Sequence, residues 1–254
     1  MCETVDPDSF LRDSLINVSK VEWPNHTGKH SLLYNCNVYF GCSHNCKYCY
    51  ARLMTLHWSP GFDWTKVKVV ENAPVLAMSD IKQPPGRIMF CSMTDPYQAI
   101  EEKTRLARRV LEIILNSEFY VLILTKSPLV TRDFDLIKRF RNVEVGFTIT
   151  ALHDIPEWER HAPSNTQRIE ALKKAHDTGI RTFVSIEPWI PNITYPADII
   201  RHLRENVDRW IIGSMQYMGV PKSYYSRRLP TLLSWLNSEK INYFLKKELR
   251  ACLT

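Results

Sequence analysis

The 254 residues carry 33 basic and 27 acidic side chains, a net charge of +6, and 44% of them are apolar. This length fits one large domain of ordinary globular composition. No stretch approaches the roughly 18 apolar residues of a membrane span, and residues 1–13 are too polar for a secretory signal. Seven cysteines, three of them in one cluster, argue against a disulfide framework. We therefore expect a reducing cytoplasmic location and no membrane partner.

The first part of the chain is expected to lead into a chemically active loop. Residues 1–30 have weak periodicity and are predicted to be an N-terminal extension that packs on the core. Residues 31–41 are predicted to form a strand, and a cysteine-rich loop and a short helix over 51–58 follow.

Regular alternation of strand and helix begins after Pro84-Pro85-Gly86. Strands are predicted at 87–92, 120–125, 143–149, 180–186 and 210–212, and helices at 101–116, 129–140, 165–177, 197–205 and 229–238. Residues 241–245 are either a last strand or the start of a terminal helix. The core is expected to span 31–215, and residues 216–254 to form a C-terminal helical segment that closes it.

Five or six β–α units in sequence predict an α/β protein with parallel strands and right-handed crossovers. The chain has only eight glycines and no glycine-rich phosphate loop, which argues against a doubly wound nucleotide-binding fold. Periodicity alone does not decide whether the sheet closes.

The cysteine loop carries the strongest chemical signal. Cys42, Cys46 and Cys49 have the spacing C-x3-C-x2-C, so one tight loop can direct three thiolates at a common centre. Three sulfurs leave a four-coordinate zinc site one ligand short, whereas iron–sulfur clusters are held by cysteine thiolates in such runs. Cys36 would make a four-cysteine zinc site conceivable, but it falls in the predicted strand, and zinc sites usually combine two separated pairs. His44 is expected to face solvent.

With the aromatic residue Tyr48 before the third cysteine, this motif resembles the signature of the radical S-adenosylmethionine superfamily. Residues 34–52 resemble a narrower group, that of spore photoproduct lyase and the "DNA repair photolyase"-like proteins, as do the runs at 94–98, 124–127 and 185–188. The resemblance implies a partial (βα)6 TIM-like barrel in a single domain, with the cluster at the C-terminal ends of the strands. It also implies a [4Fe-4S] cluster, S-adenosylmethionine bound to its fourth iron, and an external electron donor of the flavodoxin or ferredoxin type. Reductive cleavage of S-adenosylmethionine would yield a 5'-deoxyadenosyl radical that abstracts hydrogen from a substrate.

Polar residues follow the predicted strands, where barrel enzymes build their active sites. Lys126 or Arg168 would pair with the carboxylate of S-adenosylmethionine as charge-assisted donors, and the resemblance places Tyr48 against the adenine. The remaining candidates for contacts with the cofactor, chiefly its amine and ribose, are Ser92, Thr94, Asp95, Thr148 and Glu187.

Cys91 is a candidate for hydrogen-atom transfer. Spore photoproduct lyase uses a cysteine outside the cluster, with tyrosines nearby, to return a hydrogen atom to the product radical. The resemblance would give this part to Cys91 together with Tyr50 or Tyr97. The favoured alternative is that Cys91 is a small buried apolar residue, as free cysteines usually are.

The sequence therefore predicts a radical S-adenosylmethionine enzyme whose substrate is a nucleoside or nucleotide, another small molecule or a DNA lesion. The modest positive charge does not select nucleic acid, because each basic cluster lies in a predicted helix with a solvated face. Two alternatives stay open: a non-enzymatic zinc module that uses Cys36 as fourth ligand, and a cluster that serves only electron transfer.

Overall fold

A computed structural model describes residues 9–19 and 30–253, and an eight-stranded sheet is its central element. The strands are, in spatial order, β11 (Tyr243–Leu245), β10 (Arg209–Ser214), β9 (Thr182–Trp189), β8 (Val143–Thr148), β7 (Tyr120–Thr125), β6 (Arg87–Phe90), β3 (Leu33–Cys36) and β2 (Ile16–Val18). All neighbours are parallel except β2, which pairs antiparallel with β3. A smaller sheet has the order β1 (Ser9–Phe10), β5 (Lys68–Val70) and β4 (Tyr39–Phe40).

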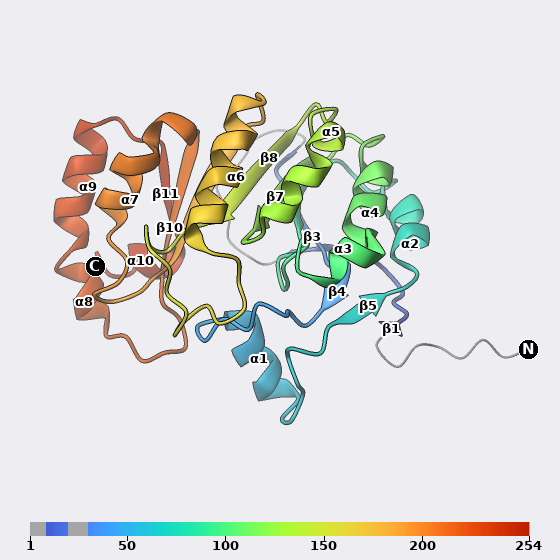
Figure 1. Cartoon of the computed structure of the whole chain (residues 1–254), viewed down its shortest axis with the longest axis horizontal. Helices are drawn as coiled ribbons and strands as arrows, with labels where there is room; N and C mark the ends of the chain where they lie inside the picture. The colour runs from blue at the N-terminus through green and yellow to red at the C-terminus, as the bar shows by residue number, and fades with distance from the viewer. Residues whose placement is uncertain (1–8, 20–29, 254) are drawn as a thin grey trace, which may run out of the picture.

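Helices connect the parallel strands and lie side by side along the outer face of the large sheet (Figure 1). They are α2 (Ala73–Asp80), α3 (Ile100–Thr104), α4 (Leu106–Ile114), α5 (Phe134–Ile137), α6 (Asn165–Asp177), α7 (Pro196–Leu203) and α9 (Leu229–Ser238), with the shorter α8 (Lys222–Ser226) and α10 (Lys247–Arg250). The strand residues that face them, such as Val121, Val145 and Val184, join the main hydrophobic core. Alternate residues such as Leu122 and Phe183 form a second cluster on the inner face, because side chains alternate along a strand.

The sheet is an open, partial barrel, as the resemblance implied. β11 and β2 lie at its two edges and do not pair with each other. Residues 241–245 were expected to form either a strand or the start of a helix. Residues 243–245 of this segment form β11, which pairs parallel with β10. The C-terminal segment 216–254 therefore extends the sheet in addition to supplying helices.

The N-terminal part of the chain also contributes strands. Residues 9–19 of the predicted extension supply β1 and β2, whereas residues 1–8 and 20–29 lie outside the described residues. The single strand predicted over 31–41 is divided into β3 and β4, which belong to different sheets. Within the described ranges, no helix is long and apolar enough to cross a membrane.

Two predicted helices are interrupted by tertiary contacts. The helix expected over 101–116 breaks at Arg105, whose φ of 49° is left-handed, and becomes α3 and α4. Glu101 is fully buried and accepts hydrogen bonds from Ala107 N at 2.8 Å and Arg132 Nη2 at 2.7 Å. Its carboxylate thus satisfies a free amide at the N-terminus of α4. The helix expected over 129–140 becomes a 3₁₀ helix, η2 (Pro128–Asp133), followed by α5.

The loops at the carboxyl ends of the strands meet at one edge of the molecule. Figure 1 shows α1 (Tyr50–Trp58) there, together with the loop between β8 and α6 and the loop after β10. The cysteine loop runs between them. Barrel enzymes build their active sites at this edge.

Candidate active site

The cysteine loop follows β4 and is shaped by Gly41. The φ of Gly41 is 89°, and a Cβ there would lie 2.8 Å from the carbonyl oxygen of Trp64. Only glycine meets both requirements without strain. Cys42 N donates to the same Trp64 oxygen at 2.9 Å, and Gln98 Nε2 donates to Gly41 O at 3.3 Å. The loop ends at Cys49, directly before α1.

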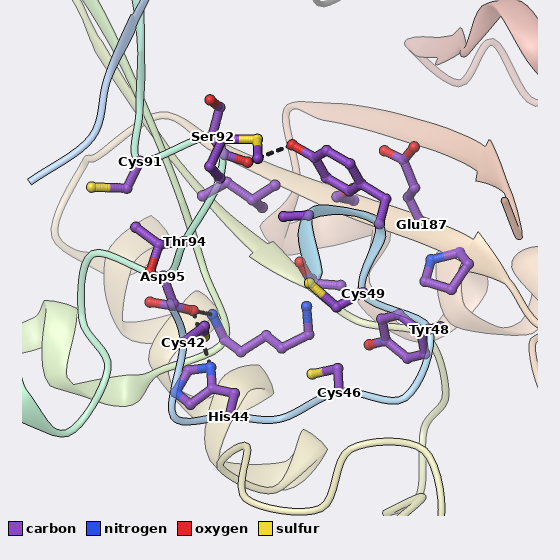
Figure 2. Close-up of a pocket in the computed structure, with 18 of the residues that line it drawn as sticks. Cys42, His44, Cys46, Tyr48, Cys49, Cys91, Ser92, Thr94, Asp95 and Glu187 are labelled. Carbon is purple, nitrogen blue, oxygen red and sulfur yellow. Dashed lines mark hydrogen bonds and ion pairs between the residues drawn. The ribbon is translucent and has the colours of Figure 1, made fainter. Parts of the chain in front are cut away.

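The three cysteines lie around one part of a pocket at the end of the sheet, as Figure 2 shows. Burial raises the pKa of Cys42, and raises that of Cys46 to about 12. Both are therefore neutral thiols at neutral pH, and iron would displace their protons on binding. Three soft thiol donors in one pocket fit an iron–sulfur cluster with one iron left free for a further ligand.

Cys36 does not join the three cysteines. It is fully buried at the end of β3, belongs to the main core and does not line the pocket. Among residues 9–19 and 30–253, no three His, Cys, Asp or Glu side chains form a group that could hold a single metal ion. The position of Cys36 in the core weighs against it as the fourth ligand of a zinc site.

Most of the predicted cofactor residues line the same pocket: Tyr48, Ser92, Thr94, Asp95, Lys126, Thr148 and Glu187. Lys126 Nζ lies 5.6 Å from the centroid of the Tyr48 ring. The Oγ of Ser92 is buried and has no hydrogen-bond partner among the described residues. A buried hydroxyl without a partner is costly, so a ligand with polar groups suits this wall of the pocket.

Asp95 and Thr94 line the pocket and also hold it together. Asp95 accepts hydrogen bonds from Thr125 Oγ1 at 2.6 Å and Lys126 N at 2.7 Å, and lies 3.4 Å from His44 Nδ1. The Thr94 hydroxyl donates to the Gly41 carbonyl. The expectation that His44 faces solvent is wrong: its exposed fraction is 4%, and burial lowers its pKa.

Glu187 lies on the wall formed by β9 and β10. Its side chain covers Gly213, where a Cβ would approach Glu187 Cδ to 2.6 Å. Glu187 Oε2 lies 3.7 Å from Lys246 Nζ. Burial raises the pKa of Glu187, and the positive charge of Lys246 opposes this shift.

Arg168, expected to pair with the cofactor carboxylate, does not line the pocket. It is 1% exposed, forms an ion pair with Glu159 at 2.5 Å, and donates through Nη1 to Thr148 O at 3.1 Å. Glu159 in turn accepts a hydrogen bond from the Tyr48 hydroxyl. Burial alone would raise the pKa of Glu159, but the charges of Arg168 and Lys126 outweigh it and lower that pKa.

Glu159 was not expected from the sequence. It lies in the long loop between β8 and α6, 11 residues after Thr148, the last residue of β8. Functional residues were expected directly after the strand end. The loop has no periodicity or motif that would single out this glutamate.

The three candidates for hydrogen-atom transfer lie in different surroundings. Tyr50 lines the pocket, and its hydroxyl donates to Ser92 O at 2.6 Å. Cys91 also lines the pocket, but it packs in the main core, has a left-handed φ of 59° and turns its sulfur away from Cys49 in Figure 2. Tyr97 is 1% exposed and does not line the pocket.

An open α/β barrel with three cysteines lining one pocket at its carboxyl end is the arrangement that an iron–sulfur enzyme of the partial-barrel class requires. The chain belongs to the radical SAM superfamily, whose family model matches residues 36–221. Membership implies a [4Fe-4S] cluster and S-adenosylmethionine, and the enzyme needs a reductant and a substrate. Membership in this enzyme superfamily therefore argues against a non-enzymatic zinc module and against a cluster that serves only electron transfer.

Curated relatives support the family and leave the reaction open. An uncharacterized protein of Methanocaldococcus jannaschii is 40% identical over 162 residues, 63% of this chain and 61% of its own length. An uncharacterized protein of Mycobacterium bovis is 30% identical over 172 residues, 63% of this chain and 51% of its own. The chain thus spans between about half and three fifths of the lengths of these relatives.

Solved structures share the fold at low sequence identity. A spore photoproduct lyase complexed with dinucleoside spore photoproduct has a TM-score of 0.60 and 15% identity, over 87% of this chain and 66% of that one. Streptococcus suis SuiB bound to S-adenosylmethionine has a TM-score of 0.56 and 9% identity, over 82% of this chain and 45% of that one.

Proposed function

We propose that this radical SAM enzyme abstracts a hydrogen atom from a nucleoside or nucleotide unit, either free or within a nucleic acid. The observation that carries the proposal is that one pocket is lined by the three cysteines and also by Lys126, Tyr48, Ser92 and Thr148. The substrate class is supported by the fold shared with spore photoproduct lyase, whose solved complex holds a dinucleoside.

Four side chains are proposed to bind S-adenosylmethionine. Lys126 pairs with its carboxylate, and Ser92, whose hydroxyl has no partner within the described ranges, accepts from its amine. Thr148 bonds the ribose, and the ring of Tyr48 lies against the adenine. The cluster, when bound, supplies the electron that cleaves the sulfonium, and these residues orient the cofactor for that cleavage.

Tyr50 is proposed to face the substrate. It is 37% exposed, lines the pocket and has its hydroxyl fixed on Ser92 O. Cys91 would need to turn its sulfur out of the core to take part, and Tyr97 would act only through intervening groups. Tyr50→Phe should therefore retain S-adenosylmethionine cleavage and lose conversion of the substrate.

The electron donor is proposed to be an external protein of the flavodoxin or ferredoxin type in a reducing cytoplasm. Six cysteines of the described chain are free thiols, which suits such a compartment. The substrate is proposed to enter from the side of α1 and the loops after β8 and β10.

The test begins with anaerobic purification and iron–sulfur reconstitution. The protein is then incubated with dithionite and S-adenosylmethionine, and 5'-deoxyadenosine is measured by chromatography. Deuterated thymidine and a deuterated thymidine dinucleotide serve as substrate probes, and deuterium in 5'-deoxyadenosine is read by mass spectrometry. Transfer of deuterium from either probe supports the substrate class. Cleavage with no transfer from either probe would contradict it, and a protein with about four irons that forms no 5'-deoxyadenosine would contradict cofactor cleavage.

A further inference from the structure

A buried tyrosine–glutamate–arginine triad connects the cysteine loop to the loop between β8 and α6. Its members are Tyr48, Glu159 and Arg168, whose exposed fractions are 7%, 5% and 1%. The Tyr48 hydroxyl donates to Glu159 Oε1, and Arg168 Nη2 lies 2.5 Å from Glu159 Oε2. The carboxylate thus uses both oxygens to join two distant segments.

The backbone reinforces this connection. Cys46 and Glu159 form an antiparallel β-bridge, and Lys47 N donates to Trp158 O at 2.8 Å. The loop after β8 therefore pairs with the cysteine loop as a short strand would. This pairing fixes the position of Glu159 relative to Cys46 without help from the side chains.

The triad also reaches the end of β8. Arg168 Nη1 donates to the carbonyl oxygen of Thr148 at 3.1 Å and to Asn165 Oδ1 at 3.1 Å. Its Nε and Nη2 donate to Pro163 O at 3.0 and 2.7 Å. With these bonds made, Arg168 has a fixed geometry, and the carboxylate that it holds is fixed as well.

We infer that Glu159 is a positioning residue for S-adenosylmethionine. It holds the Tyr48 ring in place and, through Arg168, links that ring to the backbone of Thr148. The inference rests on the proposed function, because it takes Tyr48 and Thr148 to be the adenine and ribose contacts. Glu159 does not line the pocket; it sets the distance between two residues that are proposed to contact the cofactor.

A second triad of the same chemistry provides a matched control. At the opposite end of the strands, Glu144 accepts from the Tyr120 hydroxyl and pairs with Arg209 and, at 3.4 Å, with Arg181. Glu144 is 1% exposed and is the second residue of β8, four residues before Thr148, a separation of about 13 Å along the strand. Loss of the charge at Glu159 leaves the buried Arg168 without its partner, and loss at Glu144 does the same to the half-buried Arg209, so both variants should lose stability. Only the triad of Glu159 reaches the pocket.

The experiment compares Glu159→Gln, Glu144→Gln and Tyr48→Phe after iron–sulfur reconstitution. Iron per chain, the melting temperature of the metal-free protein and the EPR spectrum of the reduced cluster are measured. S-adenosylmethionine is then titrated against the EPR change that it causes, in samples frozen before cofactor cleavage, so that the signal reports binding. Tyr48→Phe removes one hydroxyl and keeps the ring, so this variant tests the contact if Glu159→Gln does not fold.

We expect Glu159→Gln to keep its iron content and to raise the half-saturating S-adenosylmethionine concentration roughly 10- to 100-fold, by analogy with the loss of a residue that orients a metal ligand. Tyr48→Phe should shift it in the same direction. The Tyr48→Phe/Glu159→Gln double variant should be no worse than Glu159→Gln, because both changes remove one contact. Glu144→Gln should shift it less than about twofold.

An equal shift in Glu159→Gln and Glu144→Gln would overturn the inference, because it would assign the effect to general destabilisation. Loss of iron in Glu159→Gln alone would also overturn it, by assigning the triad to cluster assembly. Failure of the proposed function gives a different result: the wild-type protein itself would then form no 5'-deoxyadenosine and show no EPR change with S-adenosylmethionine.

Discussion

Replacement of Lys126 by methionine tests the assignment of the pocket most directly. The backbone amide of Lys126 donates to Asp95 Oδ2 at 2.7 Å, and this bond does not involve the side chain. The fold at the end of β7 should therefore persist. The side chain of Lys126 makes a cation–π contact with Tyr48, in which Nζ lies 5.6 Å from the ring centroid.

The two interactions of Lys126 predict separate magnitudes. Loss of the cation–π contact should cost about 0.5–1 kcal/mol of folding stability, a decrease in Tm of about 1–4 °C for a chain of this size. Loss of a charged hydrogen bond to the cofactor carboxylate should cost about 1.5–3 kcal/mol of binding, which is about 10- to 150-fold in affinity. The variant should thus show a large rise in KM for S-adenosylmethionine with kcat little changed, the pattern of lost uniform binding.

The assay is 5'-deoxyadenosine formation under dithionite as a function of S-adenosylmethionine concentration, with iron content and Tm measured in parallel. Lys47→Met is the control, because Lys47 Nζ lies 5.1 Å from the centroid of Trp158 in a comparable contact but does not line the pocket. Lys47→Met should leave KM unchanged. A KM for Lys126→Met within about twofold of the wild-type value, at normal iron content, would refute the carboxylate assignment.

Three further predictions concern the cluster and the stability of the barrel. Cys46→Ala should abolish the brown colour, iron binding and 5'-deoxyadenosine formation. Cys252 is a buried thiol outside the pocket, so Cys252→Ala should retain all three. Cofactor cleavage by Cys46→Ala would disprove the ligand assignment. Gly146→Ala should lower the free energy of unfolding by about 1–3 kcal/mol, because the new Cβ would lie 2.1 Å from the buried ring of Phe183; a loss below about 0.5 kcal/mol in urea unfolding would show that the interior relaxes around it. Burial raises the pKa of Cys36 far above its ordinary value, so its contribution to stability is complete below about pH 8.5 and is lost as the unfolded-state thiol ionises at higher pH. Between about pH 9.5 and 11, the free energy of unfolding of the wild-type protein should therefore fall more steeply than that of Cys36→Ala, by about 1.4 kcal/mol per pH unit. Equal slopes of unfolding free energy against pH for the two proteins would contradict this.

Local sequence features determined the class of the protein. The spacing of Cys42, Cys46 and Cys49 confines three thiols to one loop whatever lies around them. The β–α alternation predicts parallel strands, and parallel strands bring their carboxyl ends to one edge. Residues directly after those ends, such as Lys126 and Thr148, were predictable for this reason, and they line the pocket.

Tertiary structure decided which side chains reach the pocket. Arg168 is on a helix that begins close to the pocket, but its guanidinium is held by Glu159 and by backbone carbonyls. Cys91 lines the pocket but turns its sulfur away from Cys49, and no spacing rule predicts the left-handed backbone that accompanies this direction. The break at Arg105 likewise accompanies the hydrogen bonds that the buried Glu101 forms beyond it.

The difference has one physical cause. Spacing along a strand or within a tight loop sets local geometry, because few backbone conformations are allowed. The direction of a long polar side chain depends instead on which partner offers the better hydrogen bonds once water is excluded. Glu159, Tyr48 and Arg168 come from segments that meet only after folding, so their connection was decided by the tertiary structure alone.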